Sequence, residues 1–448
     1  MNEKTGQVVI ILLIVFSLQR GWAEETMNLS LDKAIEIALE NNLNIKQAQE
    51  TITIGEAKVG KVKSEWYPNL TLGLGSGCNE ILNLPGESQT FEFLGQTYEI
   101  KPPLSFQWSN TLSLRLTQNI YTGGRLRGSS KGVRAEFEAR RKGYEVVKNN
   151  LILQVKKAYW ELARADLLVR LSGETVDHHR QILELAGLRL SQGTIAPIEV
   201  EQARVNLVNE EDNLIQTQNR RRELEDELKA LLEIEFEAGI VPIDEPSSSA
   251  SPRIDIDEAI NNGLKRRVEL LKLRKELQAG EGALMVARSG RYPHLALRAS
   301  YNWAGSNKNY KDAWKDLKES SWEVGLSLSY SIFDGHLTKN KIKEAESNLK
   351  IAEYALLKKE KEIVKEIRNA CSKLILSRRR IEKTGKNVDL AEENSRIARL
   401  QFKMGAITSN EVNNYQVVLS QARTKHIEAL IDYEIARAEL EWAMGETR

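Results

Sequence analysis

The chain has 448 residues, of which 28% are charged, and its formal net charge is +1. Because a nucleic-acid-binding protein normally carries a clear basic excess, this balance argues against that class. Two cysteines are too few for a secreted module held together by several disulfides.

The N-terminus has the features of a secretory signal peptide. Lys4 precedes an apolar run from Val8 to Leu18, and small residues stand at positions 21 and 23. A membrane-spanning helix needs roughly 20 apolar residues, so this run is too short to be an anchor. We expect cleavage after Ala23 and export of the mature chain.

The remainder of the chain contains two copies of one unit. The pattern of residues 31–35 returns at 256–260, and the Tyr-Pro pair at 67–68 returns at 292–293. Self-similarity over such a long unit indicates a duplication rather than a short solenoid repeat. We therefore divide the chain into a signal peptide at 1–23, a first repeat at 24–235, a linker at 236–255 and a second repeat at 256–448.

Each copy is expected to begin with one helix, at 29–66 in the first copy and at 256–291 in the second. Apolar residues recur in the first of these segments at steps of three and four, and the second repeats its opening pattern. Asn28 or Ser30 can cap the first helix. The Tyr-Pro pair ends it, because the residue before a proline is pushed toward an extended conformation.

The pattern then changes to a period of two. Leucines at 70, 72 and 74 alternate with small or polar residues, and so do leucines at 112, 114 and 116. Segments around 295–299 and 324–330 repeat the alternation, and aromatic residues gather at the strand ends. An apolar face, a polar face and aromatic ends are typical of transmembrane β-strands. A half-buried sheet in a soluble protein is the alternative.

A glycine turn and a very long helix follow the second strand of each copy. Between Gly124 and Gly193 lie 68 residues without a proline, and between Gly335 and Gly405 lie 69. Each helix extends about 100 Å, and its apolar residues have coiled-coil spacing. The returning helices are expected at 198–235 and 410–444. The entry and returning helices together match the long helix in length, so we expect them to be stacked end to end beside it.

This order of elements resembles the outer-membrane efflux protein (TolC-like) family. The resemblance rests on the duplicated Asp-x-Ala-Ile entry, the Tyr-Pro pairs, the glycine turns at 123–124 and 335, and the glycine tips at 193 and 405. It implies a mainly α-helical chain with four β-strands, which in a trimer form a 12-strand transmembrane β-barrel above a periplasmic tunnel of antiparallel coiled-coil helices.

The same resemblance implies the partners and the role. The chain would form a homotrimer in outer-membrane lipid, and it would dock to a periplasmic adaptor protein that is fed by an inner-membrane pump. Its implied role is an exit duct of tripartite efflux or type I secretion in a Gram-negative bacterium, which conducts substrate passively through an iris-like periplasmic aperture.

The resemblance also implies roles at the helix tips. Glu411 falls on one acidic ring position of the family, and Glu199 is its counterpart in the first copy. Both tip glycines also fit a left-handed helix C-cap, and Glu411 also fits a first-turn carboxylate favoured by the helix dipole. The tip residues expected to dock the adaptor are Gly193, Thr194, Ile195, Gly405, Ala406 and Ile407.

The closure contacts of the family do not carry over to this chain. The arginine and tyrosine that close the aperture in better-known members are replaced by Ile407 and Phe402. The second acidic ring position is occupied by Asn414. A pair between Lys403 and Glu199 is a candidate substitute.

The residue patterns favour neither an enzyme nor a cofactor or metal site. Ser/His/Asp, Cys/His and paired-carboxylate arrangements at workable spacing are missing from the sequence. His178 and His179 are adjacent in a predicted helix and therefore do not face one site.

A soluble periplasmic coiled-coil scaffold is the competing hypothesis. Drugs, metal ions and proteins are equally compatible cargoes of an exit duct with this sequence.

Overall fold

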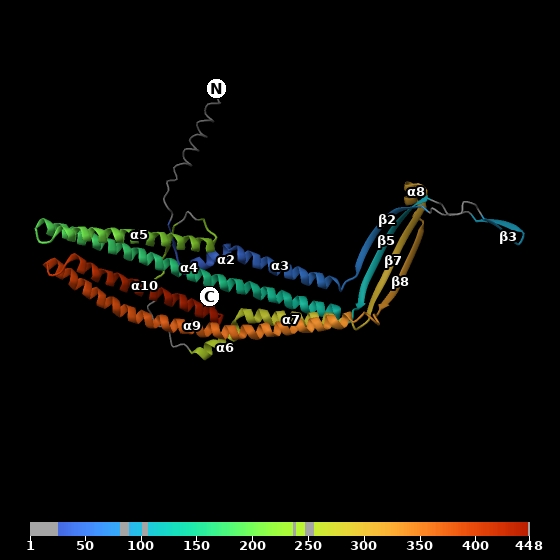
Figure 1. Cartoon of the computed structure of the whole chain (residues 1–448). Helices are drawn as coiled ribbons and strands as arrows, with labels where there is room; N and C mark the ends of the chain where they lie inside the picture. Colours follow the sequence, from blue (N-terminus) through green and yellow to red (C-terminus); the bar gives the residue numbers. More distant parts are fainter. Residues whose placement is uncertain (1–25, 81–88, 101–105, 236–238, 247–254, 447–448) are drawn as a thin grey trace, which may run out of the picture. The chain divides into compact units, whose positions relative to one another are not determined.

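The computed structural model describes residues 26–80, 89–100, 106–235, 239–246 and 255–446 (Figure 1). The expected signal peptide at 1–23 lies outside the described residues. The described chain divides into two compact units, and both repeats contribute to each. Unit 1 contains Arg141–Leu271 with the described residues before Ile52 and after Leu356, and unit 2 contains Ile52–Arg140 and Lys272–Leu356.

The long helices have the extent that their glycine boundaries predict. α4 spans Arg125–Ser191 and α9 spans Leu337–Met404, with 67 and 68 residues respectively. The returning helices, α5 at Pro197–Leu232 and α10 at Ser409–Met444, have 36 residues each. Within the described part of the chain, no helix has the length and apolarity that a membrane crossing requires.

Each entry helix is broken once, whereas the sequence predicted a continuous helix. The first copy has α2 at Leu31–Asn41 and α3 at Leu43–Ser64, and the second has α6 at Ile256–Arg266 and α7 at Val268–Ser289. Ser30, one of the two predicted candidates, is the N-cap of α2. A break of one residue barely disturbs the helical period of the flanking apolar residues, so the sequence pattern does not reveal it.

Buried polar side chains occupy both breaks. Asn42 donates from Nδ2 to the carbonyl oxygen of Leu231 at 3.1 Å, and its Oδ1 accepts from Asn44 N at 2.9 Å. The bond from Asn44 N replaces backbone pairing that the interrupted helix has lost, and the bond to Leu231 satisfies a carbonyl oxygen at the end of α5. The first break is therefore stabilised by contact with the end of α5.

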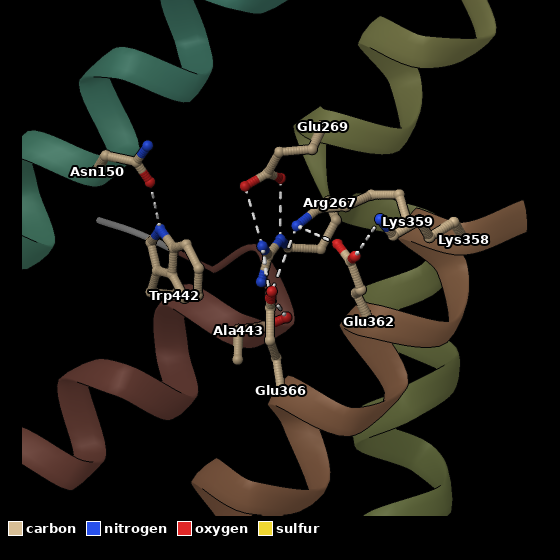
Figure 2. Close-up of polar contacts among 9 residues, drawn as sticks. All are labelled: Asn150, Arg267, Glu269, Lys358, Lys359, Glu362, Glu366, Trp442 and Ala443. Atoms are coloured by element: carbon tan, nitrogen blue, oxygen red, sulfur yellow. Dashed lines mark hydrogen bonds and ion pairs between the residues drawn. The ribbon is translucent and has the colours of Figure 1, made fainter. Parts of the chain in front are cut away.

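Arg267 occupies the second break (Figure 2). Its side chain is only 2% exposed. Its guanidinium donates to both carboxylate oxygens of Glu269, at 2.9 and 3.0 Å, and lies 2.9 Å from Glu366 Oε2 of α9. It also donates to the carbonyl oxygen of Ala443 at 3.3 Å and lies 4.0 Å from the ring centre of Trp442 in α10. A buried charge is tolerated when it is paired and hydrogen-bonded in this way, so Arg267 ties the second break to α9 and α10.

Unit 2 contains an antiparallel sheet in the order β2-β5-β7-β8 (Figure 1). The strands are β2 at Asn69–Glu80, β5 at Phe106–Tyr121, β7 at His294–Asn307 and β8 at Glu319–Ser329. These are the four predicted strands. The paired residues form rows across the four strands, and successive rows lie on opposite faces of the sheet. One row contains Leu72, Leu114, Tyr301 and Trp322.

One side of this sheet, called here the apolar face, carries nearly all of its large apolar side chains. Leu72 is 64% exposed, Leu326 66% and Trp322 73%, which is far more than a folded protein leaves in water without cause. Transfer of each such side chain out of water is favourable by about 2 kcal/mol of free energy. The residues of the apolar face are Leu70, Leu72, Leu74, Leu112, Leu114, Leu116, Leu297, Ala299, Tyr301, Trp303, Trp322, Val324, Leu326 and Leu328.

Several short elements were not predicted from the sequence. β1 at Thr26–Leu29 pairs in parallel with β6 at Gly239–Pro242, which lies in the segment expected to be a linker. β3 at Gln89–Phe93 and β4 at Gln96–Ile100 form a hairpin in the first strand connection, and α8 at Tyr310–Lys315 lies in the second. Strands of four or five residues are too short to show a reliable alternation.

The β1–β6 pair belongs to the core of unit 1. Leu29 and Ile240 are fully buried and pack in one cluster with Tyr159 and with Leu228 and Leu232 of α5. The Tyr159 hydroxyl lies 2.6 Å from Asp244 Oδ2 and 3.0 Å from the carbonyl oxygen of Leu29. The described part of the linker is therefore fixed to the helices by burial and hydrogen bonds.

Candidate functional site at the helix tips

Glycines make the two turns that connect the long helices to the returning helices. Gly193 has a φ of +72° and Gly405 a φ of +81°, in the left-handed region that favours glycine. After each glycine the chain turns back on the helix end: Thr194 N donates to the carbonyl oxygen of Arg189 at 3.0 Å, and Ala406 N donates to that of Gln401 at 2.9 Å. Both glycines therefore serve as C-caps, as their position after a helix suggested.

The returning helices begin differently in the two copies. Thr408 and Glu411 form a reciprocal capping box at the start of α10, in which Glu411 Oε2 accepts from Thr408 N at 2.8 Å and from Thr408 Oγ1 at 3.0 Å. The backbone bond from Thr408 lowers the pKa of the Glu411 carboxyl below its usual value of 4.5. Pro197 is the first residue of α5, and its N-cap Ala196 makes no side-chain bond.

The tips of the two repeats share a small apolar core. Phe402 is 1% exposed and packs with Val412 of α10 and Val200 of α5, and Ile195 and Ile407 pack against the same cluster. Because these side chains come from both hairpins, they hold the two turns together.

Two polar contacts accompany this core. The hydroxyl of Ser409 donates to the carbonyl oxygen of Glu199 at 3.4 Å, and the Arg189 guanidinium carbon lies 4.9 Å from the ring centre of Phe402. Phe402 is thus enclosed by its own chain. Within this chain Phe402 supports the turn, and its role as a closure contact stays a prediction.

The remaining tip residues lie at the surface. Lys403, Asn414 and Glu411 are exposed, and Glu199 is half-buried. Among the described residues, Lys403 and Glu199 form no ion pair with each other within this chain. Their pairing as a closure contact therefore stays a prediction.

Exposed apolar side chains near the tips were not singled out from the sequence. Ile198 is 71% exposed and Met404 76% exposed, and each stands within five residues of a tip glycine. Leu188 and Leu400 are also exposed and line a groove of 460 Å³ together with His178 of α4 and Arg399 of α9. The groove combines apolar surface with charged side chains, among them Arg396, Lys403 and Glu184, which is a composition suited to binding a partner helix.

Farther from the tips, charged residues of α10 connect α4 with α9. Glu439 contacts Lys157 and Lys373, Asp432 contacts Arg164 and Arg380, and Arg423 contacts Glu174 and Glu392. In each case one partner comes from α4 and the other from α9, so the pairs oppose separation of the hairpins of the two repeats. No element of this ladder was predicted from the sequence, because such pairs join residues up to 282 positions apart.

The comparisons with known proteins agree with this architecture. The family model for outer membrane efflux protein matches residues 34–232 and 259–446. The chain is 21% identical over 416 residues to nodulation protein T of Rhizobium leguminosarum bv. trifolii, covering 92% of this chain and 83% of that protein. It is 25% identical over 305 residues to the outer membrane protein TolC of Vibrio cholerae, covering 67% of this chain and 69% of that protein.

The fold is also that of solved outer-membrane channels. The structure of the outer membrane protein VceC from Vibrio cholerae matches with a TM-score of 0.76 and 18% identity, covering 93% of this chain and 96% of that chain. At this identity the match shows the mainly helical fold with its strand segment. Since the family model covers most of both repeats, the chain belongs to the outer membrane efflux protein family.

Proposed function

We propose that the protein is the exit duct of a tripartite efflux or type I secretion system, and that it works as a homotrimer in the outer membrane of a Gram-negative bacterium. The observation that carries the proposal is the apolar face of the four-stranded sheet. Large apolar side chains cover one side of the sheet; in the single chain those of the edge strands β2 and β8 are exposed, and most of those on the central strands are half-buried. Lipid is the environment in which that exposure is favourable.

Four strands cannot close a barrel, and unpaired strand edges are not tolerated in a bilayer. Within the described residues, β2 and β8 are the edge strands of the sheet. Three chains would pair β2 of one with β8 of the next and give 12 strands, which is within the range of outer-membrane barrels. The polar faces would then line a water-filled interior.

The helices would continue the duct through the periplasm as antiparallel coiled coils, with the tips at the periplasmic end. The adaptor would dock at residues 193–195 and 405–407, and an inner-membrane pump would supply the substrate. Glu411 and Glu199 of three chains would form acidic rings at the aperture, and Lys403 would reach Glu199 of a neighbouring chain. We retain the signal peptide at 1–23, the repeats at 24–235 and 256–448 and the linker at 236–255 as part of this proposal.

The test is the native mass of the protein extracted from outer membranes in detergent. We expect a particle of three chains, each beginning at Glu24, that opens conductance steps in a planar bilayer. A monomer in the soluble periplasmic fraction would refute the duct and favour a coiled-coil scaffold. The exposed leucines of the apolar face oppose that second function, because a soluble scaffold would leave them in water.

A further inference from the structure

The connection between β7 and β8 folds back over one end of the apolar face. It contains α8, whose Tyr310 ring lies 5.1 Å from that of Trp108 in β5, nearly perpendicular to it. Ala313 is fully buried against the sheet. A Cβ on Gly305 would lie 2.5 Å from the carbonyl oxygen of Ala313, so only a glycine allows this approach.

The strand register assigns these contacts to the apolar face. Asn110 pairs with Gly305 and stands two residues from Leu112, so all three side-chain positions share one face. With its amide oriented to satisfy both neighbours, Asn110 accepts from Trp314 Nε1 at 3.1 Å. Asn307 donates to Asp316 Oδ2 at 2.9 Å from the same side. We call residues 307–318 the α8 segment.

The α8 segment lies just beyond the apolar part of the sheet. β7 begins shortly after helix α7 ends. The last residues of β7 therefore lie at the end of the sheet that is farther from α7. From Leu295 to Trp303 the strand extends about 27 Å before tilt is considered. This is close to the roughly 25 Å height of the apolar band in membrane barrels. The α8 segment would therefore lie at the depth of the outer-leaflet headgroups.

The charges of the α8 segment are arranged with the cations outward. Its four lysines are exposed, whereas Asp312 and Asp316 are half-buried and accept hydrogen bonds from Asn309 and Asn307. Lys315 lies 3.7 Å from Asp312 and Lys318 3.2 Å from Asp316, but both lysine side chains are nearly 80% exposed, so these pairs are weak. The ammonium groups are available to an external anion.

We propose that the α8 segment binds the phosphate groups of outer-leaflet lipid, with Lys308, Lys311, Lys315 and Lys318 as the phosphate ligands. Tyr310 and Trp314 have the amphipathic rings that favour a membrane interface. A bound headgroup would fix the β7–β8 connection over the rim of the barrel. The inference rests on the proposed function, since it requires the apolar face to meet lipid.

The experiment compares lipid binding by the detergent-purified full-length mature protein. The probe is lipid A with two phosphates, titrated and followed by native mass spectrometry, with dephosphorylated lipid A and inorganic phosphate as parallel arms. The test variant replaces the four lysines of the α8 segment with glutamine. The matched control replaces four exposed lysines of α9 with glutamine, at Lys350, Lys358, Lys361 and Lys365.

We expect the test variant to bind lipid A at least tenfold more weakly than wild type, because each lysine near an anionic surface contributes about a fivefold factor. The control variant should bind lipid A with the affinity of wild type. Dephosphorylated lipid A should bind wild type and the test variant with similar affinity. Inorganic phosphate should not compete at concentrations near those of the lipid, which separates a headgroup site from a simple phosphate site.

Binding of lipid A by the test variant within twofold of wild type would overturn the inference, and so would equal losses in both variants. The proposed function is measured separately in the same preparations, by native mass and by conductance. A conducting trimer whose lipid A binding is unchanged by the four lysine substitutions refutes only the lipid site. A monomer without conductance refutes the duct itself.

Discussion

Glu411 has two proposed duties, a cap on α10 and a charge at the aperture, and two substitutions separate them. Glutamine at position 411 can complete the same capping box through its side-chain oxygen, but it carries no charge. Thr408→Ala removes the hydroxyl to which Glu411 N donates at 3.3 Å, and it leaves the carboxylate charge in place. Glu411→Gln therefore tests the charge, and Thr408→Ala tests the cap.

The expected sizes of the two effects differ. Loss of the threonine cap should destabilise the start of α10 by about 1 kcal/mol in each chain. Three carboxylates at roughly 8 Å from a permeating ion, in water screened by physiological salt, should raise local cation concentration about threefold. The same potential lowers local chloride concentration by about the same factor, so Glu411→Gln should reduce the preference for potassium over chloride about ninefold.

The assay is the reversal potential of the reconstituted trimer in a planar bilayer under a KCl gradient, with thermal unfolding measured on the same samples. Thr408→Ala should lower the melting temperature and keep the selectivity of wild type. At neutral pH Glu411→Gln should lower the melting temperature less than Thr408→Ala does, and it should lose selectivity. Unchanged selectivity in Glu411→Gln would mean that the carboxylate is only a cap, and equal selectivity losses in both variants would refute the separation of the two duties.

A comparison of wild type with Glu411→Gln also gives a pH test. Because the folded pKa of Glu411 is lowered, its charge stabilises the fold above the unfolded pKa near 4.5, and this contribution is lost as the pH falls through the lower folded pKa. The melting temperature of wild type should therefore approach or fall below that of Glu411→Gln as the pH is reduced from 7 to 3. A difference that does not change with pH would contradict the hydrogen-bonded carboxylate.

Three further predictions concern stability and are measured by thermal unfolding in detergent. Arg267→Met should cost about 3 kcal/mol, because it leaves the half-buried carboxylates of Glu269 and Glu366 without their cation. Glu366→Gln should cost about 1 kcal/mol, and the reverse order would contradict the role of Arg267. Burial lowers the pKa of His179 below its usual value of 6.5, so its neutral form stabilises the fold above pH 6.5, and this contribution is lost as the pH falls through the lower folded pKa. His179→Leu should therefore reduce the acid-induced fall in melting temperature, and an unchanged fall would exclude this contribution. Gly193→Ala and Gly405→Ala should each cost about 1 kcal/mol through the left-handed φ, and a neutral result at both would refute the capping role.

The boundaries of the main elements could be predicted because local chemistry determines them. A Tyr-Pro pair ends each entry helix, and a left-handed glycine ends each long helix. The alternation of leucines gave the correct face of every strand, since the side-chain period of a strand is independent of its partners. The tip residues could be located for the same reason, because they stand directly beside a capping glycine.

The contacts at those tips could not be predicted in this way. Phe402 is an apolar residue on a helix, and the sequence does not show that Arg189 and Val412 enclose it. The pairs of Asp432 with Arg164 and Arg380 involve three helices, and one of them spans 268 residues. Such contacts depend on which helix faces meet, and a one-dimensional pattern contains no information on that.

The sequence by itself determined the duplicated order of the main elements, the lengths of the long and returning helices and the two faces of the sheet, because each follows from periodicity or from a capping residue. Only the tertiary structure decided the breaks at Asn42 and Arg267, the β1–β6 pair and the position of α8 over the apolar face. Each of these depends on a partner far along the chain. The free energy that makes a buried arginine or a four-residue strand stable comes from that partner and not from the local sequence.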